Sequence, residues 1–236
     1  MLSMEHKANY IFDYYHPTKE TKTPIQTKQQ WNPYMNNEGS VMALAGKDFV
    51  IAAADKRLSS GYSILSRNAS KLYRLTDKAI LASSGMYADV VALRKYLKAR
   101  IEIYKTTNKK EPSLLSVAQL LSVALYQRRF FPYYAFNVLC GQSEEGEFLC
   151  YSYDAVGSFE KFPYGCQGSG MQLIAPVFDK IYDKNPNINV EDAKNLMLEI
   201  MNGVAQRDIY TGDAVELMIL KADGEFTTEE QQLRHD

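Results

Sequence analysis

Residues 39–71, which read GSVMALAGKDFVIAAADKRLSSGYSILSRNASK, carry the pattern that decides the fold. Two short β-prone runs, at 40–45 and 49–54, are joined by Gly46-Lys47-Asp48, a tripeptide typical of a hairpin turn. The second run ends in Ala-Asp-Lys-Arg, and a lysine, Lys71, begins the next predicted strand. This stretch therefore predicts antiparallel strands that meet through tight turns.

The rest of the chain alternates strands with pairs of helices. Because the helices come in pairs and not singly between strands, the order argues against a parallel doubly wound sheet. It predicts an α+β fold, an antiparallel four-layer α-β-β-α sandwich with a helix layer outside each sheet. The predicted helices span 86–104, a segment after the N-cap Ser113, 169–182, and 190–206 after the N-cap Asn189. Further strands are predicted at 71–75, 79–84, 136–141, 147–153 and 213–221, with a short one at the end.

Composition limits the classes of function. The 236 residues are 46% hydrophobic with a net charge of −1, which argues against a nucleic-acid or membrane-surface partner held by bulk charge. No apolar run reaches the 18 residues that a membrane helix needs. The three cysteines fit no metal motif and predict free buried thiols in a reducing compartment. The three histidines lie near the chain ends, so any chemistry would run without histidine, and no cofactor or metal is expected.

Two regions are predicted. Residues 1–30 are polar, rich in lysine and threonine, and without sustained periodicity, which is typical of an extension or a propeptide-like leader. Residues 31–236 would form the folded domain. The first residues lack the apolar core of a secretory signal, so cytoplasm and nucleus are the expected locations.

The stretch 39–71 resembles the β-subunit family of the proteasome, whose members have the N-terminal-nucleophile hydrolase fold. In that family, propeptide cleavage frees a threonine whose own amine assists its hydroxyl in place of histidine. The threonine position falls on Gly39, which has no side-chain oxygen and cannot attack a carbonyl. The resemblance implies that the other site positions are filled by Asp55, Lys71, Gly85 at the oxyanion region, Ser169, Asp208 and Thr211.

Further motifs resemble the non-catalytic branch that occupies the sixth position of the eukaryotic β ring. That branch usually has Gly-Gly-Thr where this chain has Glu38-Gly39-Ser40. The resemblance covers about residues 31–236 and leaves the first 30 uncovered. The motifs that carry it are Trp31-Asn32-Pro33-Tyr34, Arg128 to Tyr134, Tyr151 to Ser158 and Arg207 to Asp213.

The resemblance implies a non-catalytic structural β subunit of the 20S proteasome core, part of a threonine-type endopeptidase complex in ubiquitin-dependent protein degradation. Its partners would be the other β subunits of a seven-membered ring, the α ring and the opposite β ring. One helix pair would meet the α ring and the other the opposite β ring. The resemblance also implies that Asp154 faces the substrate channel of the neighbouring catalytic subunit, although an aspartate in a turn is more often simply solvated.

Alternatives remain open for several residues. Asp55 and Lys71 could be a working acid–base pair, but a buried ionic cluster inherited with the fold is favoured in the absence of a nucleophile. Arginines 128 and 129 are expected at a helix end that Pro132 stops, with the aromatics around them in the core or in subunit contacts. Ser40 could serve an active hydrolase, but strand alternation directs it away from the side that Gly39 faces. The last alternative is a free-standing monomeric binding module that only shares the fold.

Overall fold

The computed structural model describes residues 32–184 and 187–233. The chain divides into two units, Met1–Pro33 and Tyr34–Asp236, and the fold described below is that of the second unit. The predicted leader, residues 1–30, lies outside the described residues and stays a prediction.

The strands are β1 Ser40–Ala45, β2 Phe49–Asp55, β3 Leu58–Ser60, β4 Ser63–Ser66, β5 Leu72–Thr76, β6 Ala79–Gly85, β7 Ala135–Gln142, β8 Phe148–Tyr153, β9 Phe159–Phe162, β10 Tyr164–Gly168, β11 Ala214–Lys221 and β12 Phe226–Gln232. The helices are α2 Tyr87–Asn108, α3 Leu114–Tyr126, α4 Met171–Lys184 and α5 Val190–Ala205.

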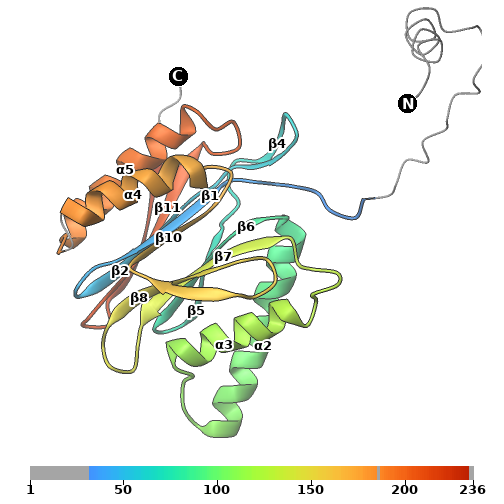
Figure 1. Cartoon of the computed structure of the whole chain (residues 1–236), viewed down its shortest axis with the longest axis vertical. Coiled ribbons are helices and arrows are strands. Elements are labelled where there is room, and N and C mark those ends of the chain that lie inside the picture. Colours follow the sequence, from blue (N-terminus) through green and yellow to red (C-terminus); the bar gives the residue numbers. More distant parts are fainter. Residues whose placement is uncertain (1–31, 185–186, 234–236) are drawn as a thin grey trace, which may run out of the picture. The chain divides into compact units, whose positions relative to one another are not determined.

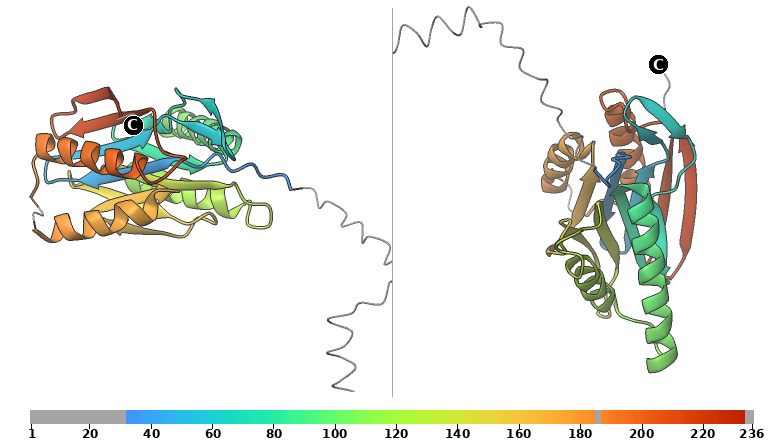
Figure 2. Two further views of the ribbon diagram at one scale, coloured as in Figure 1. Left: turned by 90° about the horizontal axis from the view of Figure 1, so that it is seen from above. Right: turned by 90° about the vertical axis from the view of Figure 1, so that its right-hand side faces the viewer.

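The second unit is a four-layer sandwich, as expected from the paired helices (Figure 1). One antiparallel sheet has the order β10-β1-β2-β11-β12 and the other β5-β6-β7-β8-β9. Helices α4 and α5 cover the first sheet and α2 and α3 cover the second, which the two turned views also show (Figure 2). The fold class predicted from the sequence is confirmed.

Strands β1 and β2 are buried on both faces, because they lie inside the sandwich with a helix layer on one side and a sheet on the other. Met42 and Leu44 pack with α4 and α5, while Val41 and Ala43 pack between the two sheets. The alternation sends successive side chains to opposite faces. The small side chains of Val41 and Ala43 allow the two sheets to pack closely. Because both faces of β1 and β2 are buried, both strands consist almost entirely of apolar residues.

The helices begin where their capping residues predict. The Ser113 hydroxyl accepts the backbone N–H of Ser116 at 3.1 Å and starts α3. The Asn189 side chain accepts the N–H of Asp192 at 2.8 Å and starts α5. Each bond satisfies a donor that the first helical turn leaves without an intrahelical partner. The apolar face of α2 consists of Val90, Leu93, Leu97 and Ile101, which are all buried.

Four strands were not expected from the sequence. Strands β3 and β4 form a separate two-stranded sheet, and β9 and β10 continue the chain from β8 into the other sheet. Their sequences mix polar and apolar residues, and β4 and β9 are largely exposed, so neither shows a buried alternating pattern. Pairing with a neighbouring strand, and not local sequence, makes them strands.

The expectation for the segment after α3 is partly wrong. Helix α3 ends at Tyr126, and its last turn contains no basic residue, so Arg128 lies beyond the reach expected for a helix dipole. Its guanidinium instead lies 4.8 Å from the ring centroid of Tyr133. Phe130 is 97% exposed and Phe131 56%, so these two aromatics are not in the core. Of the two roles expected for these aromatics, the core or a contact with another subunit, only the second is compatible with their exposure.

The three cysteines are free and buried, as the sequence predicts. None of the helices within residues 32–184 and 187–233 is long and apolar enough to cross a membrane. In the same residues, no three His, Cys, Asp or Glu side chains gather in a way that could hold a metal ion.

Candidate active site

Gly39 precedes β1, and the antiparallel pairing of β1 with β2 brings the end of β2 beside it. The backbone N–H of Ser40 donates to the Asp55 carboxylate at 2.8 Å. Lys71 lies just before β5 in the other sheet, and its ammonium reaches the same carboxylate at 3.0 Å. Three positions that are distant in the sequence therefore meet at one end of the sandwich, as the resemblance implies.

The Lys71 ammonium is fully occupied by oxygen atoms. Besides the Asp55 carboxylate, it donates to the Asp55 carbonyl at 2.8 Å and to the Arg57 carbonyl at 2.7 Å. An ammonium has three N–H donors and no acceptor, so all three donors are used. The side chain is only 3% exposed. This lysine is held as a structural cation and has no donor left for a substrate.

The Asp55 carboxylate is fully buried and accepts several hydrogen bonds. Besides Ser40 and Lys71, the backbone N–H of Arg57 donates to it at 3.1 Å and that of Gly212 at 3.4 Å. Burial raises the pKa of Asp55 above its ordinary value, while the Lys71 charge and the N–H groups of Ser40 and Gly212 oppose that shift. This geometry is that of a buried ionic cluster, the reading favoured from the sequence.

Gly39 faces this cluster with no room for a side chain. Its φ is +92°, in the region that favours glycine. A Cβ atom built there would lie 2.5 Å from Cε and 2.7 Å from Nζ of Lys71, and 2.9 Å from Oδ1 of Asp55. The position that the resemblance pairs with the nucleophile thus carries no side-chain oxygen, and the Lys71 side chain lies where a Cβ would be. A side chain at this position would have to shift the end of the Lys71 side chain relative to its three acceptors.

A second hydrogen-bonded chain completes the site on the other side of Gly39. The Gly39 N–H donates to the Ser169 hydroxyl at 3.2 Å, and that hydroxyl donates to Asp208 at 2.6 Å. The Thr211 hydroxyl donates to the same Asp208 oxygen, also at 2.6 Å. The structure therefore brings together the three residues that the resemblance pairs with the nucleophile position.

The Ser40 hydroxyl points away from the Lys71 ammonium. It is fully buried, 2.6 Å from the Thr211 hydroxyl, and it accepts the backbone N–H of Gly170 at 3.0 Å. The Gly39 position faces Lys71, whereas the Ser40 side chain contacts Thr211 and the backbone of Gly170. This geometry supports the expectation that Ser40 does not take over as nucleophile.

Gly85 and Asp154 lie outside this cluster. Gly85 ends β6 with a φ of +110°, and a Cβ there would lie 2.5 Å from the Tyr134 carbonyl oxygen. Asp154 is exposed in the turn after β8, and its carboxylate accepts the N–H groups of Val156 at 3.0 Å and Ser158 at 2.8 Å. Within this chain, the carboxylate of Asp154 thus holds its own turn.

Two supporting residues were missed by the sequence reasoning. The Asn37 amide donates to the Ser59 carbonyl at 2.9 Å, and its oxygen accepts the N–H of Tyr87 at 2.9 Å, which fastens the segment before β1 to the start of α2. Arg57 donates through Nε to Asp213 at 2.9 Å. Arg57 lies between β2 and β3 and Asp213 directly precedes β11, so the signal for this pair required knowledge that β2 and β11 are neighbours.

We expect the Asp213 ion pairs to make stability depend on pH. Burial alone would raise the pKa of Asp213, but hydrogen bonds from Arg57 and Arg67 outweigh it, so the pKa lies below its ordinary value of 3.8. An Asp with a lowered folded-state pKa contributes stability above its unfolded pKa and loses it as the pH falls through the folded value. Replacing Asp213 with Asn should therefore lower the unfolding free energy by about 2 kcal/mol at neutral pH. This value lies between the small contribution of an exposed ion pair and the larger loss when a buried pair is broken.

Urea unfolding at neutral pH and at several values below about 4 would measure this effect. The difference between wild type and Asp213→Asn should shrink as the pH falls. Asparagine tolerates the left-handed backbone of this position, where φ is +67°. Asp77→Asn is the control, because Asp77 is 76% exposed in its pair with Arg74. A constant difference for Asp213→Asn across this range would contradict the prediction.

Comparison with known proteins identifies the family of the chain. A family model described as proteasome subunit matches residues 35–220. Proteasome subunit beta type-1 of Arabidopsis thaliana is 49% identical over 223 residues, which cover 89% of this chain and 100% of that protein. The protein of the same name from Petunia hybrida is 45% identical, with 89% and 100% covered, and that from Drosophila melanogaster is 41% identical, with 86% and 90% covered. The chain belongs to the proteasome subunit family.

Proposed function

We propose that this chain is a non-catalytic β subunit of the 20S proteasome core, at the sixth position of a seven-membered β ring. The observation that carries the proposal is Gly39 in a site whose remaining residues are in place. The position has no hydroxyl, and the Lys71 ammonium fills the space a side chain would need. The relatives named proteasome subunit beta type-1 support the choice of ring position.

The supporting positions hold the fold together in this proposal. Asp55 and Lys71 connect the ends of β2 and β5, which belong to different sheets. Ser169, Asp208 and Thr211 connect the start of α4 to the loop after α5. The chain keeps these bonds because they fasten the two sheets and two helices at one end, whether or not a nucleophile is present.

The outer helix layers supply surfaces for assembly. Large apolar side chains are exposed on both helix pairs, although isolated soluble domains bury most such groups. We assign one pair to contact with the α ring and the other to contact with the opposite β ring. These side chains are Ile103, Leu115 and Val123 on α2 and α3, and Leu173 and Val177 on α4.

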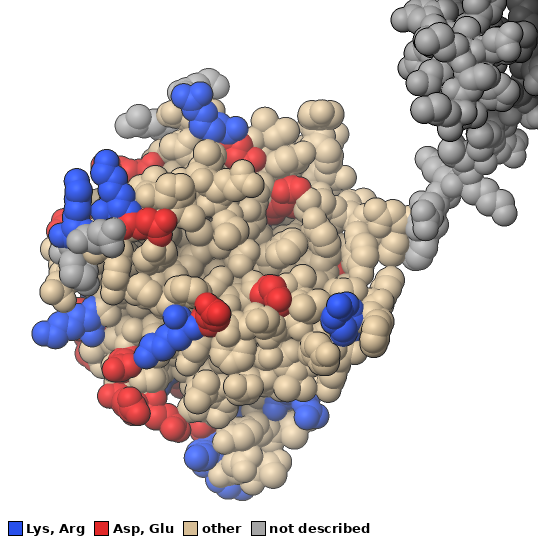
Figure 3. Space-filling view, in the orientation of Figure 1, with Lys and Arg blue, Asp and Glu red and all other residues tan. Residues whose placement is uncertain are grey.

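Charge supports a protein partner over a nucleic acid. The face drawn in Figure 3 mixes Lys and Arg with Asp and Glu around a broad uncharged area. A nucleic-acid site would instead need a concentrated basic surface. Cytoplasm and nucleus are the proposed locations, supported by the free buried thiols, which suit a reducing compartment.

Native mass spectrometry of material purified from its own cells tests the proposal. The expected result is a particle of many different subunits in which this chain begins upstream of Ser40. Intact-mass measurement of the released chain gives its first residue. A free monomer would contradict the assembly, and a chain that begins at Ser40 would favour the active-hydrolase alternative.

We further propose that Asp154 contributes to the substrate channel of the neighbouring catalytic subunit. Asp154→Ala should change the KM or kcat of that neighbour for chymotrypsin-like peptides, with an effect that varies with the P3 side chain. Because the carboxylate also holds the turn at Val156 and Ser158, Asp154→Asn is the matched control that keeps an acceptor and removes the charge. Unchanged KM and kcat across several P3 side chains would contradict the proposal.

A further inference from the structure

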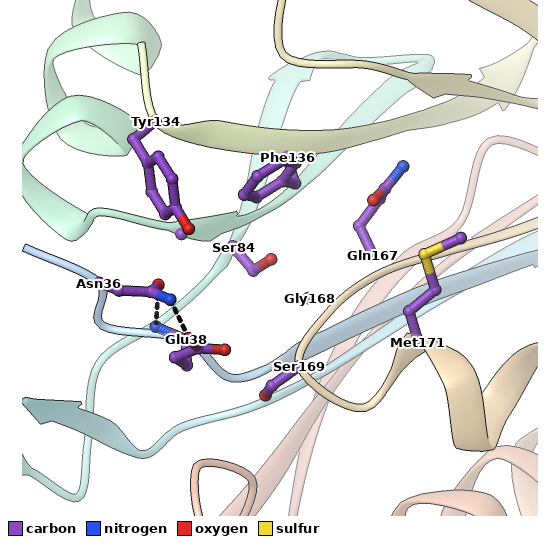
Figure 4. A pocket seen from close by; sticks show the side chains of 10 residues that line it. Asn36, Glu38, Ser84, Tyr134, Phe136, Gln167, Gly168, Ser169 and Met171 are labelled. Carbon is purple, nitrogen blue, oxygen red and sulfur yellow. Dashed lines mark hydrogen bonds between the residues drawn. The ribbon is translucent and has the colours of Figure 1, made fainter. Parts of the chain in front are cut away.

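A cavity of about 230 Å³ lies beside the Gly39 site. It is enclosed by the segment before β1, the ends of β6 and β7, and the connection from β10 to α4 (Figure 4). The buried ion pair of Asp55 and Lys71 does not line this cavity. The side chains of Glu38, Ser84, Tyr134, Phe136 and Ser169 line it, and Met171 lies at its rim.

The Ser84 hydroxyl is the first sign that the cavity receives a ligand. Ser84 is 2% exposed, and its oxygen is one of two buried side-chain polar atoms without a hydrogen-bond partner in residues 32–184 and 187–233. Figure 4 shows it directed into the cavity. A buried hydroxyl without a partner costs about 1–3 kcal/mol, so an occupant that bonds to it gains that energy.

Gly168 lies beside this hydroxyl. Its φ is +101°, and a Cβ atom there would lie 1.9 Å from the Gly39 carbonyl oxygen and 2.8 Å from the Ser84 oxygen. The close approach of the Gly39 backbone therefore requires glycine here, and the absence of a side chain also leaves the Ser84 hydroxyl uncovered on that side.

The walls of the cavity suit a cation. Tyr134 and Phe136 form an edge-to-face pair with ring centroids 5.2 Å apart, and aromatic rings attract cations. Among the described residues that line the cavity, Glu38 is the one carboxylate, and none carries a positive charge. Burial, and next the nearby charge of Asp208, raise the pKa of Glu38 above its ordinary value, as expected where negative charge lacks a cation.

We propose that this cavity binds the basic side chain, arginine or lysine, of a peptide. The stem would lie against Tyr134 and Phe136, and the charged end would donate to Glu38 and to the Ser84 hydroxyl. A bound water would satisfy Ser84 alone and would make no use of the aromatic walls or the carboxylate. The inference rests on the proposed function, because the proteasome chamber supplies the peptides.

The experiment measures how fast a cysteine at the rim of the cavity is alkylated in the assembled particle. Met171 lines the cavity and is 42% exposed, so Met171→Cys places a thiol there without changing the proposed binding groups. Peptidase sites are blocked first, and peptide mass spectrometry follows iodoacetamide labelling of Cys at this position. The probes are acetyl-alanyl-arginine amide and its neutral isostere, in which citrulline replaces arginine.

The arginine probe should slow alkylation several-fold, and the citrulline probe should leave the rate nearly unchanged. Adding Glu38→Gln to the Met171→Cys particle should abolish most of the protection, because it removes the charge-assisted bond and keeps the shape. Ser84→Ala in the same background should weaken protection more modestly. Equal protection by both probes, or protection that survives Glu38→Gln, would overturn the inference.

The outcome is separable from the proposed function. Native mass of the Met171→Cys particle shows whether the chain is assembled before any probe is added. An assembled particle in which millimolar arginine probe gives no protection refutes the cavity and leaves the subunit role intact. A chain that never enters a particle refutes the subunit role, and the same labelling on the free chain still reports on the cavity, because the lining residues named above all belong to this chain.

Discussion

Gly39→Thr should yield no peptidase activity and should lower the free energy of unfolding by about 3–5 kcal/mol, the range for breaking a buried ion pair. The new Cβ would lie 2.5 Å from the Lys71 side chain, so the ammonium must shift relative to the Asp55 carboxylate and the two carbonyl oxygens that it bonds. The left-handed φ of +92° adds strain for any residue other than glycine. Activity-directed covalent labelling of this chain, read as an intact-mass shift, and urea unfolding measure the two effects.

Two substitutions separate the causes. Gly39→Ala should destabilise nearly as much as Gly39→Thr, because the clash begins at Cβ. Gly224→Ala is the control for backbone strain, since φ there is +84° and no atom lies within 4 Å of the added Cβ. It should cost only about 1–2 kcal/mol, the usual penalty of a left-handed conformation. Covalent labelling of the Gly39→Thr chain would show that the site is complete except for its hydroxyl, contrary to this prediction.

Lys71→Met should destabilise the chain by about 3–5 kcal/mol, because it leaves the fully buried Asp55 carboxylate without its cation. The methionine side chain has a similar volume, so the loss reports on charge and hydrogen bonding more than on packing. The Asp55 and Arg57 carbonyl oxygens lose a donor at the same time. Equilibrium urea unfolding of the purified full chain would measure the effect.

A double-mutant cycle shows whether the ion pair is the cause. With Asp55→Asn added, no buried charge remains, so the double variant should be less destabilised than the sum of the two single variants by about 2 kcal/mol. Asp77→Asn with Arg74→Met gives the comparison for an exposed pair, where the coupling should fall below about 1 kcal/mol. Additive effects at Asp55 and Lys71 would show that the two side chains act independently, against the structure.

Much of the fold could be predicted because its buried elements have strong local signals. Strands β1 and β2 are almost wholly apolar, α3 and α5 begin at residues whose side chains cap them, and α2 carries a regular apolar face. Strands β4 and β9 are largely exposed and have no such signal, so only pairing defines them. Exposed Phe130 shows the same limit, because an aromatic residue does not reveal on its own which surface it serves.

The candidate site divides in the same way. Asp55, Lys71 and Gly39 could be found from one continuous stretch that resembles a known family. Asn37, Arg57 and the Ser84 cavity could not, because their partners Tyr87, Asp213 and Gly168 are brought close only by strand pairing and by the packing of the two sheets. These contacts join positions far apart in the sequence, and no local pattern encodes such distances.

By itself, the sequence determined that position 39 has no nucleophile, since glycine carries no oxygen in any conformation. Only the tertiary structure showed that the space beside Gly39 is occupied. The Lys71 ammonium lies where a side chain at position 39 would be, and all three of its N–H donors bond to carbonyl and carboxylate oxygens. The physical reason is that a buried charge must be fully solvated by the protein. Lys71 therefore takes the position in which Asp55 and the backbone satisfy it, and that position is the space beside Gly39.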